Sequence, residues 1–237
     1  MSALFSPKMN HLPRRAAWIM AVVGLLLAGG IYYICTPKTW RAGFTPEQPI
    51  PFSHKVHVEQ LGMDCAACHT SAAYSSRAGI PDANSCFSCH RQILPDSPRL
   101  RPLHTSVNKT SPHYTGVPLM WNKAYRLPDY AVFNHSVHVN RGVGCTSCHG
   151  DVSRMDQISV KTSLSMAWCL DCHRNPAPYL VPLEKVTDPR YTAEAFLKSH
   201  PQTNAQGEAV TTPSEFQSQL QQNWKIHPRT DCAACHH

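Results

Sequence analysis

The sequence predicts a mainly α-helical fold with extensive coil and few or no strands. Three observations support this fold class. Residues 16–35 form one uncharged apolar segment. The pentapeptide Cys-x-x-Cys-His occurs five times after this segment. The chain also has twenty prolines and few long apolar runs. Proline interrupts helices and favours turns. We therefore expect one N-terminal helix followed by a loop-rich region organised around the five pentapeptides.

The apolar segment 16–35 reads AAWIMAVVGLLLAGGIYYIC. Twenty residues of helix span about 30 Å, the thickness of the hydrocarbon core of a bilayer. Lys8, Arg14 and Arg15 precede the segment, and basic residues favour the cytoplasmic side. The sequence therefore predicts a single-pass protein of the cytoplasmic (inner) membrane in contact with the lipid bilayer. Residues 1–37 would be the cytoplasmic tail and transmembrane anchor, and residues 38–237 a periplasmic or extracytoplasmic domain.

A cleavable signal peptide is the main alternative for this segment, with cleavage near Ala28-Gly29-Gly30. Its apolar region should be shorter, about 7–15 residues, so we favour a retained anchor. Both alternatives put the rest of the chain outside the cytoplasm. Cys35 could carry a lipid at the membrane boundary, but the residues before it are not small, which favours an unmodified thiol.

The pentapeptide Cys-x-x-Cys-His is typical of covalent c-type haem attachment. Two thiols add across the haem vinyl groups, and the adjacent histidine becomes the proximal iron ligand. The sequence therefore predicts five covalently bound haem c groups. The cysteines of the first to fifth motifs, which would bind the cofactors, are Cys65 and Cys68, Cys86 and Cys89, Cys145 and Cys148, Cys169 and Cys172, and Cys232 and Cys235. The proximal iron ligands would be His69, His90, His149, His173 and His236.

Other interpretations of these cysteines fit less well. A disulfide framework would not place histidine after every second cysteine, and a zinc site built from Cys-x-x-Cys halves would not need it there. A thioredoxin-like redox motif occurs once, not five times. With five haems, residues 51–237 offer too little protein per haem to bury an ordinary core. We therefore expect a haem-packed multihaem cytochrome c domain.

The formal net charge of +7 does not indicate nucleic-acid binding. Residues 51–237 hold 17 Lys plus Arg against 14 Asp plus Glu, and the propionates of five haems would offset that small excess. We expect no nucleic-acid partner.

The chain contains an internal repeat, because the segment Phe-x-His-x-x-His starts at Phe52 and again at Phe133, 81 residues later. Each copy is followed by two haem motifs, which defines repeat units 52–90 and 133–173. A fixed-period repeat indicates duplicated structural units. The fifth motif lies in a separate C-terminal haem segment, 224–237.

A low-spin electron-transfer haem needs a sixth ligand, and the repeated histidines can supply four. Two histidines at i and i+3 on a helical turn cannot reach one iron from the same side, so each pair would serve two different haems. These predicted distal ligands are His54, His57, His135 and His138. For the remaining haem the candidates are Met166, Met155 and His227, with His104, His113 and His200 as weaker ones. Methionine ligation would raise the reduction potential of that haem above the potential of a haem with two histidine ligands.

The segments outside the repeat are less informative. Residues 91–132 contain six prolines, which exclude long helices. Residues 174–231 hold a short helical candidate at 193–198 and a polar stretch at 202–223, which we expect to be a loop or a docking arm.

The repeated unit resembles the class III multihaem cytochromes. The longer stretches PEQPIPFSHKVH (46–57), LPDYAVFNHSVHVNRGVGCTSCHG (127–150) and LSMAWCLDCHRNP (164–176) resemble the pentahaem cytochrome c subunit of alternative complex III. The resemblance covers about 46–176, the anchor and the final TDCAACH (230–236). Residues 177–223 and the middle linker match poorly.

This resemblance implies a subunit of a respiratory-chain quinol:electron-acceptor oxidoreductase. Its partners would be an iron–sulfur subunit, polytopic quinol-binding subunits and a monohaem cytochrome c. Quinol oxidation would occur on other subunits, so no catalytic residue is expected here. The five haems would relay electrons towards a soluble periplasmic cytochrome c or a terminal oxidase. Most haems would have two histidine ligands. One haem would have a methionine ligand, and Met155 or Met166 is then the favoured residue.

Two alternatives remain open. A membrane-anchored multihaem quinol dehydrogenase that feeds a periplasmic reductase would also have one N-terminal helix and bis-His haems. A catalytic multihaem enzyme such as a nitrite reductase would need an iron with an open position, whereas the supply of ligands here is ample.

Overall fold

The computed structural model describes residues 9, 11–35 and 42–236. Helix α1 (Leu12–Cys35) contains the predicted apolar segment, and none of its residues is buried. It is long and apolar enough to cross a membrane, with a mean hydropathy of 2.0; near an N-terminus, membrane anchors and signal sequences share these properties. Lys8 and the expected domain boundary at 37/38 lie outside the described residues.

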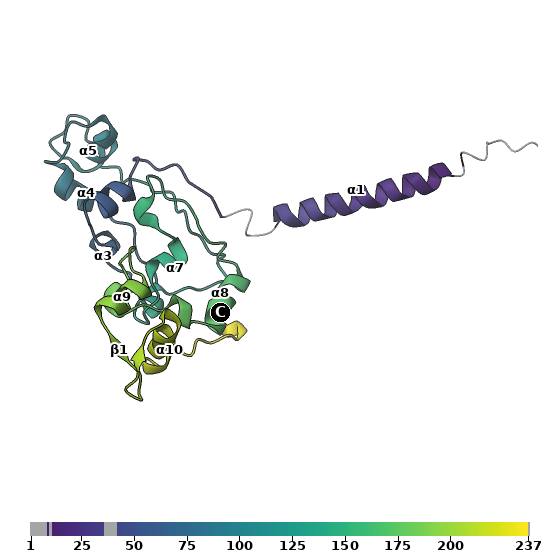
Figure 1. Ribbon diagram of the computed structural model, residues 1–237. Coiled ribbons are helices and arrows are strands. Elements are labelled where there is room, and N and C mark those ends of the chain that lie inside the picture. Colours follow the sequence, from purple (N-terminus) through teal and green to yellow (C-terminus); the bar gives the residue numbers. More distant parts are fainter. Residues whose placement is uncertain (1–8, 10, 36–41, 237) are drawn as a thin grey trace, which may run out of the picture.

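The rest of the described chain is short helices joined by coil (Figure 1), which confirms the predicted fold class. A π-helix, η2, spans Lys55–Gln60. The α-helices after α1 are α3 (Cys65–Cys68), α4 (Ala83–His90), α5 (Arg101–Val107), α6 (His135–Val139), α7 (Cys145–His149), α8 (Met166–Arg174), α9 (Ala193–Ser199) and α10 (Pro213–Asn223). Five 3₁₀ turns are η3 (Pro98–Leu100), η4 (Val152–Arg154), η5 (Ala177–Tyr179), η6 (Leu183–Lys185) and η7 (Cys232–Ala234).

The haem motifs begin in helical turns because capping residues precede several of them. The Asp64 carboxylate accepts a hydrogen bond from the Ala66 amide at the start of α3, and Asp82 accepts one from the Ser85 amide at the start of α4. The Ser165 hydroxyl caps α8 in the same way. Side-chain oxygens at these positions satisfy amides that have no partner within the helix. A helical turn then presents two cysteines at i and i+3 on one face.

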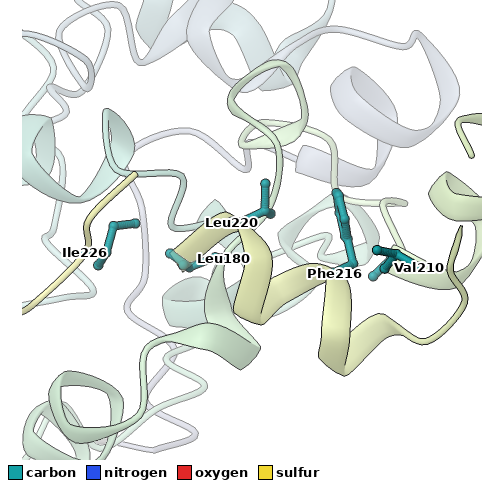
Figure 2. Close-up of a cluster of buried hydrophobic side chains, with 6 residues drawn as sticks. Leu180, Val210, Phe216, Leu220 and Ile226 are labelled. Carbon is teal, nitrogen blue, oxygen red and sulfur yellow. The ribbon is translucent and has the colours of Figure 1, made fainter. Parts of the chain in front are cut away.

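Among the residues that the structure describes, the cluster of buried hydrophobic side chains lies in the C-terminal third of the chain. Leu180, Phe216, Leu220 and Ile226 cluster there with Val210 and Ala193 (Figure 2). Phe216 and Leu220 are one helical turn apart on α10, so they present one apolar face to Leu180. Thr212 and Glu215 form a capping box at the start of α10, where Pro213 occupies the first turn.

This core corrects the expectation for residues 202–223. They form neither a loop nor a docking arm: strand β1 (Gln202–Thr203) pairs antiparallel with β2 (Ala209–Val210), and α10 packs against the cluster. Polar residues dominate the stretch, but Phe216 and Leu220 are enough to anchor the helix. The expected helix at 193–198 is confirmed as α9.

By contrast, the helices that carry the motifs bury almost nothing of their own. Helices α3, α4, α6, α7 and α8 contain no buried residue. Short helices need an apolar surface to pack against. Helix α4 packs on α5, where Leu103 is fully buried, whereas the side chains of the other four helices remain at least partly exposed.

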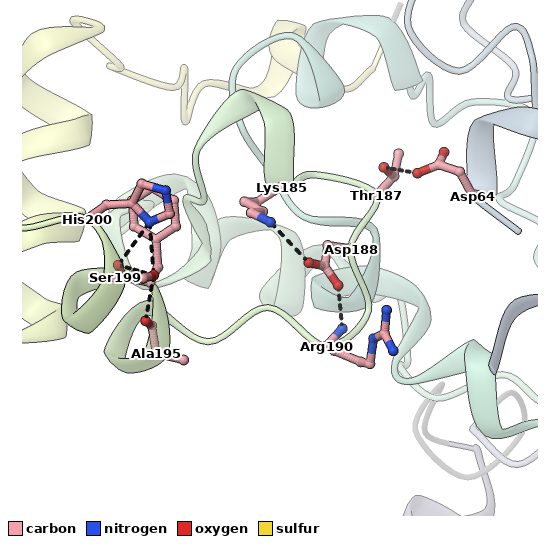
Figure 3. Close-up of polar contacts among 9 residues, drawn as sticks. Asp64, Lys185, Thr187, Asp188, Arg190, Ala195, Ser199 and His200 are labelled. Atoms are coloured by element: carbon pink, nitrogen blue, oxygen red, sulfur yellow. Dashed lines mark hydrogen bonds and ion pairs between the residues drawn. The ribbon is translucent and has the colours of Figure 1, made fainter. Parts of the chain in front are cut away.

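Polar contacts join the first repeat unit to the segment before α9. The second oxygen of Asp64 accepts a hydrogen bond from the Thr187 hydroxyl at 2.6 Å, and the neighbouring Lys185 pairs with Asp188 at 3.5 Å (Figure 3). Asp64 therefore both caps α3 and holds it against residues 185–188.

Candidate metal centres

The two Phe-x-His-x-x-His segments adopt the same ring geometry. The Phe52 ring meets His54 edge to face at 4.8 Å between centroids and stacks on His57 at 4.5 Å. In the second unit, the Phe133 ring meets His135 at 4.8 Å and stacks on His138 at 4.4 Å. The sequence repeat is therefore also a structural repeat, and one phenylalanine ring holds both histidines of each pair.

Each of three repeat histidines faces the histidine of a motif. The ring centroids are 6.1 Å apart for His57 and His90, 6.4 Å for His135 and His149, and 6.2 Å for His138 and His173. With a metal–nitrogen bond of about 2.0 Å and about 1.2 Å from that nitrogen to the ring centre, two imidazoles on opposite sides of one metal have centroids about 6.4 Å apart. The three separations fit one metal ion between each pair.

The fourth repeat histidine, His54, lies close to the first motif. Burial, with smaller contributions from the neighbouring His69 and His57, lowers its pKa to about 4. Its Nδ1 is buried without a hydrogen-bond partner in the described structure, whereas the equivalent His135 donates from Nδ1 to the Ser76 carbonyl at 2.9 Å. The His57 carbonyl accepts from the Met63 amide at 3.0 Å, two residues before Cys65, so the segment that carries His54 lies beside the first motif.

Hydrogen bonds leave Nε2 available in most of these histidines. A backbone carbonyl only accepts, so an Nδ1 that bonds to one carries the proton. In the motifs, Nδ1 donates from His69 to Gly79, from His90 to Ile93, from His173 to Arg229 and from His236 to Tyr130, at 2.6–3.0 Å. In the repeat segments it donates from His57 to Ser53 and from His138 to Asn134, both at 2.8 Å. Such bonds fix ring orientation and tautomer in metal-bound histidines.

Burial keeps two of the site histidines, His149 and His138, neutral. It lowers the pKa of His149 to about 4, with further contributions from the nearby His135 and His69, and it lowers the pKa of His138. Desolvation disfavours the imidazolium form, and a metal needs the neutral imidazole. At neutral pH both rings are therefore in the form that binds iron.

Two of the motif cysteines, Cys148 and Cys172, are neutral thiols at pH 7. Burial raises the pKa of Cys148 to about 12 and that of Cys172 to about 11. All eleven cysteines lie in the described part of the chain, and none forms a disulfide, which argues against a disulfide framework. Within residues 9, 11–35 and 42–236, no three His, Cys, Asp or Glu side chains converge on one point, so these residues offer no zinc site. Pairs of histidines that face each other, together with pairs of free thiols, are the groups that a covalently attached haem needs.

Comparison with known proteins agrees with this geometry. Residues 50–107 match the family model of cytochrome c7 and related cytochrome c. The multihaem cytochrome c subunit of a menaquinone reductase from Nitratidesulfovibrio vulgaris is 32% identical over 149 residues, which cover 54% of this chain and 69% of that subunit. The chain belongs to the multihaem cytochrome c family. Its cofactors are therefore covalently bound c-type haems.

The fifth motif of this multihaem cytochrome has no opposed histidine ring among the described contacts, so its surroundings matter. Met166 is the first residue of α8, is 64% exposed, and lies one turn before Cys169. Burial raises the pKa of Cys169, and the nearby Cys235 adds to the shift, so this face of α8 adjoins the fifth motif. Met155 is buried, and its carbonyl accepts from the Lys55 amide of η2. His227 is exposed two residues before Arg229.

His104, a weaker candidate for that position, lies elsewhere. Its ring meets Phe87 of the second motif edge to face at 5.3 Å, because α5 packs against α4. Its Nε2 is buried without a hydrogen-bond partner in the described part of the cytochrome. His104 therefore adjoins the second motif, not the fifth.

Sequence reasoning missed several supporting residues. It noted Phe52 and Phe133 in the repeat but gave their rings no role. It did not single out Tyr125, whose ring packs on His149 at 4.5 Å and whose hydroxyl accepts from the Lys161 amide at 3.1 Å. The repeat could have pointed to the two phenylalanines, whereas no sequence pattern marks Tyr125.

Proposed function

We propose that this multihaem cytochrome is the electron-transfer subunit of a membrane-bound, quinone-linked respiratory complex. The observation that carries the proposal is the set of opposed histidine rings at 6.1–6.4 Å. Iron held between two such rings has no open position for a substrate, so the sites suit electron relay better than catalysis. The relative's name, a menaquinone reductase subunit, supports the link to quinone.

Five haem c groups are proposed, one for each motif. The two cysteines of each motif would form the thioethers, and the adjacent histidine would be the proximal ligand. His54, His57, His135 and His138 would be the distal ligands of the first, second, third and fourth sites. When bound, the haems supply one-electron chemistry at iron. The chain orients the imidazoles through Phe52 and Phe133 and keeps those of His54 and His138 neutral by burial.

Met166 is our preferred sixth ligand at the fifth site, with Met155 and His227 as alternatives. Cys169 and Met166 share one face of α8, because they are three residues apart. His173 of α8 donates from Nδ1 to the Arg229 carbonyl at 2.7 Å, three residues before Cys232, which supports a position of α8 beside the fifth motif. The high exposure of the Met166 side chain, 64%, leaves its thioether free to bind a group not made of protein.

Helix α1 is proposed to remain attached as a membrane anchor, with residues from about 38 onward outside the cytoplasm. Its 24 residues correspond to about 36 Å of helix, slightly more than one hydrocarbon core. A retained anchor would keep the haem domain at the membrane surface beside quinone-binding partners.

The specific complex is proposed to be an alternative complex III. A quinol oxidised on polytopic partner subunits would give up two electrons and two protons. The electrons would pass singly through an iron–sulfur subunit and this chain to a monohaem or soluble cytochrome c, or to a terminal oxidase. A second candidate is the reverse direction, in which a soluble cytochrome supplies electrons for quinone reduction. The name of the menaquinone reductase relative favours that second candidate.

The test is turnover by the purified membrane complex in both directions. Reduction of a soluble cytochrome c by a quinol, faster than reduction of quinone by a reduced cytochrome, would support the first candidate. The opposite ratio would support the second. A complex that does neither, yet supplies electrons to a soluble reductase, would support a quinol dehydrogenase instead.

A further inference from the structure

We propose that the five haem sites form one unbranched row, in the order second, first, third, fourth and fifth motif. The motif at Cys86 and the motif at Cys232 would then be its two ends, although Cys232 alone lies at an end of the sequence. This inference rests on the proposed function, because it takes each motif to be a haem site. Each neighbour relationship in the row is carried by separate contacts.

The second and first sites are neighbours because one element serves both. His54 is the residue that precedes η2, and His57 lies within η2. His57 faces His90 of the second motif at 6.1 Å, and the His57 carbonyl accepts from the Met63 amide at 3.0 Å, two residues before Cys65 of the first motif. The Phe52 ring contacts both histidines, so the two sites share one rigid wall.

The first and third sites are joined by two independent contacts. His135, which faces His149 of the third motif, donates from Nδ1 to the Ser76 carbonyl, in the loop that follows the first motif. In addition, Cys65 and Cys145 bond to consecutive carbonyls. The Cys65 thiol donates to Thr187 at 3.3 Å, and the Cys145 amide donates to Val186 at 3.0 Å. The two repeat units therefore meet at their leading motifs.

The third and fourth sites are neighbours for the same reason as the second and first. His135 and His138 both lie on α6, whose N-cap is Asn134. Their rings face His149 and His173 respectively, and the Phe133 ring contacts both of them.

The fifth site adjoins the fourth. His173 donates from Nδ1 to the Arg229 carbonyl at 2.7 Å, three residues before Cys232. The Cys235 carbonyl accepts from the Val132 amide at 2.8 Å, next to the phenylalanine that stacks on His138. Both contacts tie the C-terminal segment to the walls of the fourth site.

The second site lies at the far end. In the described part of the chain, the hydrogen bonds of residues 82–107 reach no further than Thr115. Figure 1 shows α4 and α5 on the opposite side of the haem-bearing region from α8 and the C-terminus. If the row ends at the second site on α4, its other end is the fifth site. External electron partners must then approach the second and fifth sites.

The direct test is an electron cryo-microscopy map of the intact complex. Each iron is assigned to its motif by its thioethers, and the nearest iron neighbours are then read off. We expect the order second, first, third, fourth, fifth. A map in which the Cys232 site adjoins the Cys86 site, or in which the third site lies at an end, would overturn the row. Fewer than five haems would instead contradict the proposed function, whatever their order.

A second test uses end-site variants in the full complex, scored by redox titration with electron paramagnetic resonance of each haem. The double variant Cys232→Ser/Cys235→Ser should shift the potential of one remaining haem, the fourth. Cys86→Ser/Cys89→Ser should shift only the first, and each variant is the control for the other. Equal shifts in the reduction potentials of two or more haems in either variant would contradict an unbranched row. If a variant is unstable, the electron cryo-microscopy map decides the order.

Discussion

His57 and His90 lie with their ring centroids 6.1 Å apart, although 33 residues separate them in the chain. The same relationship recurs between His138 and His173 at 6.2 Å. In both units the repeat histidine donates from Nδ1 to a carbonyl four residues earlier, which leaves Nε2 free to bind a metal. Under the proposed function, the duplicated segment is therefore a preformed clamp for haems attached elsewhere.

Replacing His57 by Ala should convert one haem from low spin to high spin, because the iron at the second site would lose its sixth ligand. His54 shares the clamp, so the first site should become heterogeneous as well. Electron paramagnetic resonance of the oxidised complex measures both effects. His200→Ala is the control, because the structure leaves this weaker candidate exposed, with its ring stacked on Phe196 at the C-terminal core. An unchanged low-spin spectrum in His57→Ala would remove this residue from the ligands.

Replacing Met166 by His should lower the potential of one haem, since a thioether stabilises ferrous iron more than imidazole does. The weak near-infrared sulfur-to-iron band of a His–Met haem should disappear at the same time. Met120→His is the control, because Met120 is 77% exposed and no contact places it at a motif. Loss of the band in Met155→His instead would transfer the assignment to Met155, and loss in neither would favour His227.

Replacing Gly142 by Ala should destabilise the protein more than replacing Gly62 by Ala. Both glycines stand three residues before a motif cysteine and have φ near +70°, at 73° and 70°, so both variants carry the same backbone strain, about 1–2 kcal/mol. Only at Gly142 would the added Cβ collide, at 2.6 Å from the Val181 carbonyl oxygen and against the Trp224 ring.

The thermal unfolding midpoints of the two glycine variants give the comparison. Equal midpoints would mean that Trp224 does not pack on the second repeat unit.

Replacing Phe216 by Ala should cost about 3–5 kcal/mol of stability, because a buried aromatic side chain leaves a cavity. Phe216 is 3% exposed in the C-terminal core. The haem content should stay the same, since the buried residues of the core all lie outside the motif helices, although Val143, two residues before α7, packs against them. Phe44→Ala, at a residue 50% exposed, should have a small effect on the unfolding midpoint. Loss of haem from Phe216→Ala would show that the core is needed for haem attachment.

Much of this arrangement follows from sequence patterns that act locally. The apolar run of α1, the five motifs and the duplicated Phe-x-His-x-x-His segments could be predicted because each is contiguous. The N-cap residues Asp64 and Asp82 were not singled out from the sequence, although aspartate before a helix is a local signal. The sequence could not predict which histidine faces which motif. His57 and His90, for example, are brought together by the tertiary path of the residues between them, which no local pattern specifies.

The C-terminal core was missed for a related reason. Residues 202–223 are polar on average, and the apolar face of α10 consists of Phe216 and Leu220. The residues that cover this face, Leu180 and Ile226, lie before and after the stretch. Only tertiary packing makes a stable helix from so weak an amphipathic pattern.

The central claim is that opposed axial ligands close every iron site of this chain, so that it conducts electrons and does not bind a substrate. Near-infrared magnetic circular dichroism of the oxidised, fully loaded protein tests this most directly, because the band position identifies the axial pair at each low-spin haem. The account predicts four bis-His haems, one His–Met haem and no high-spin haem. A high-spin haem, or fewer than three bis-His haems, would contradict it.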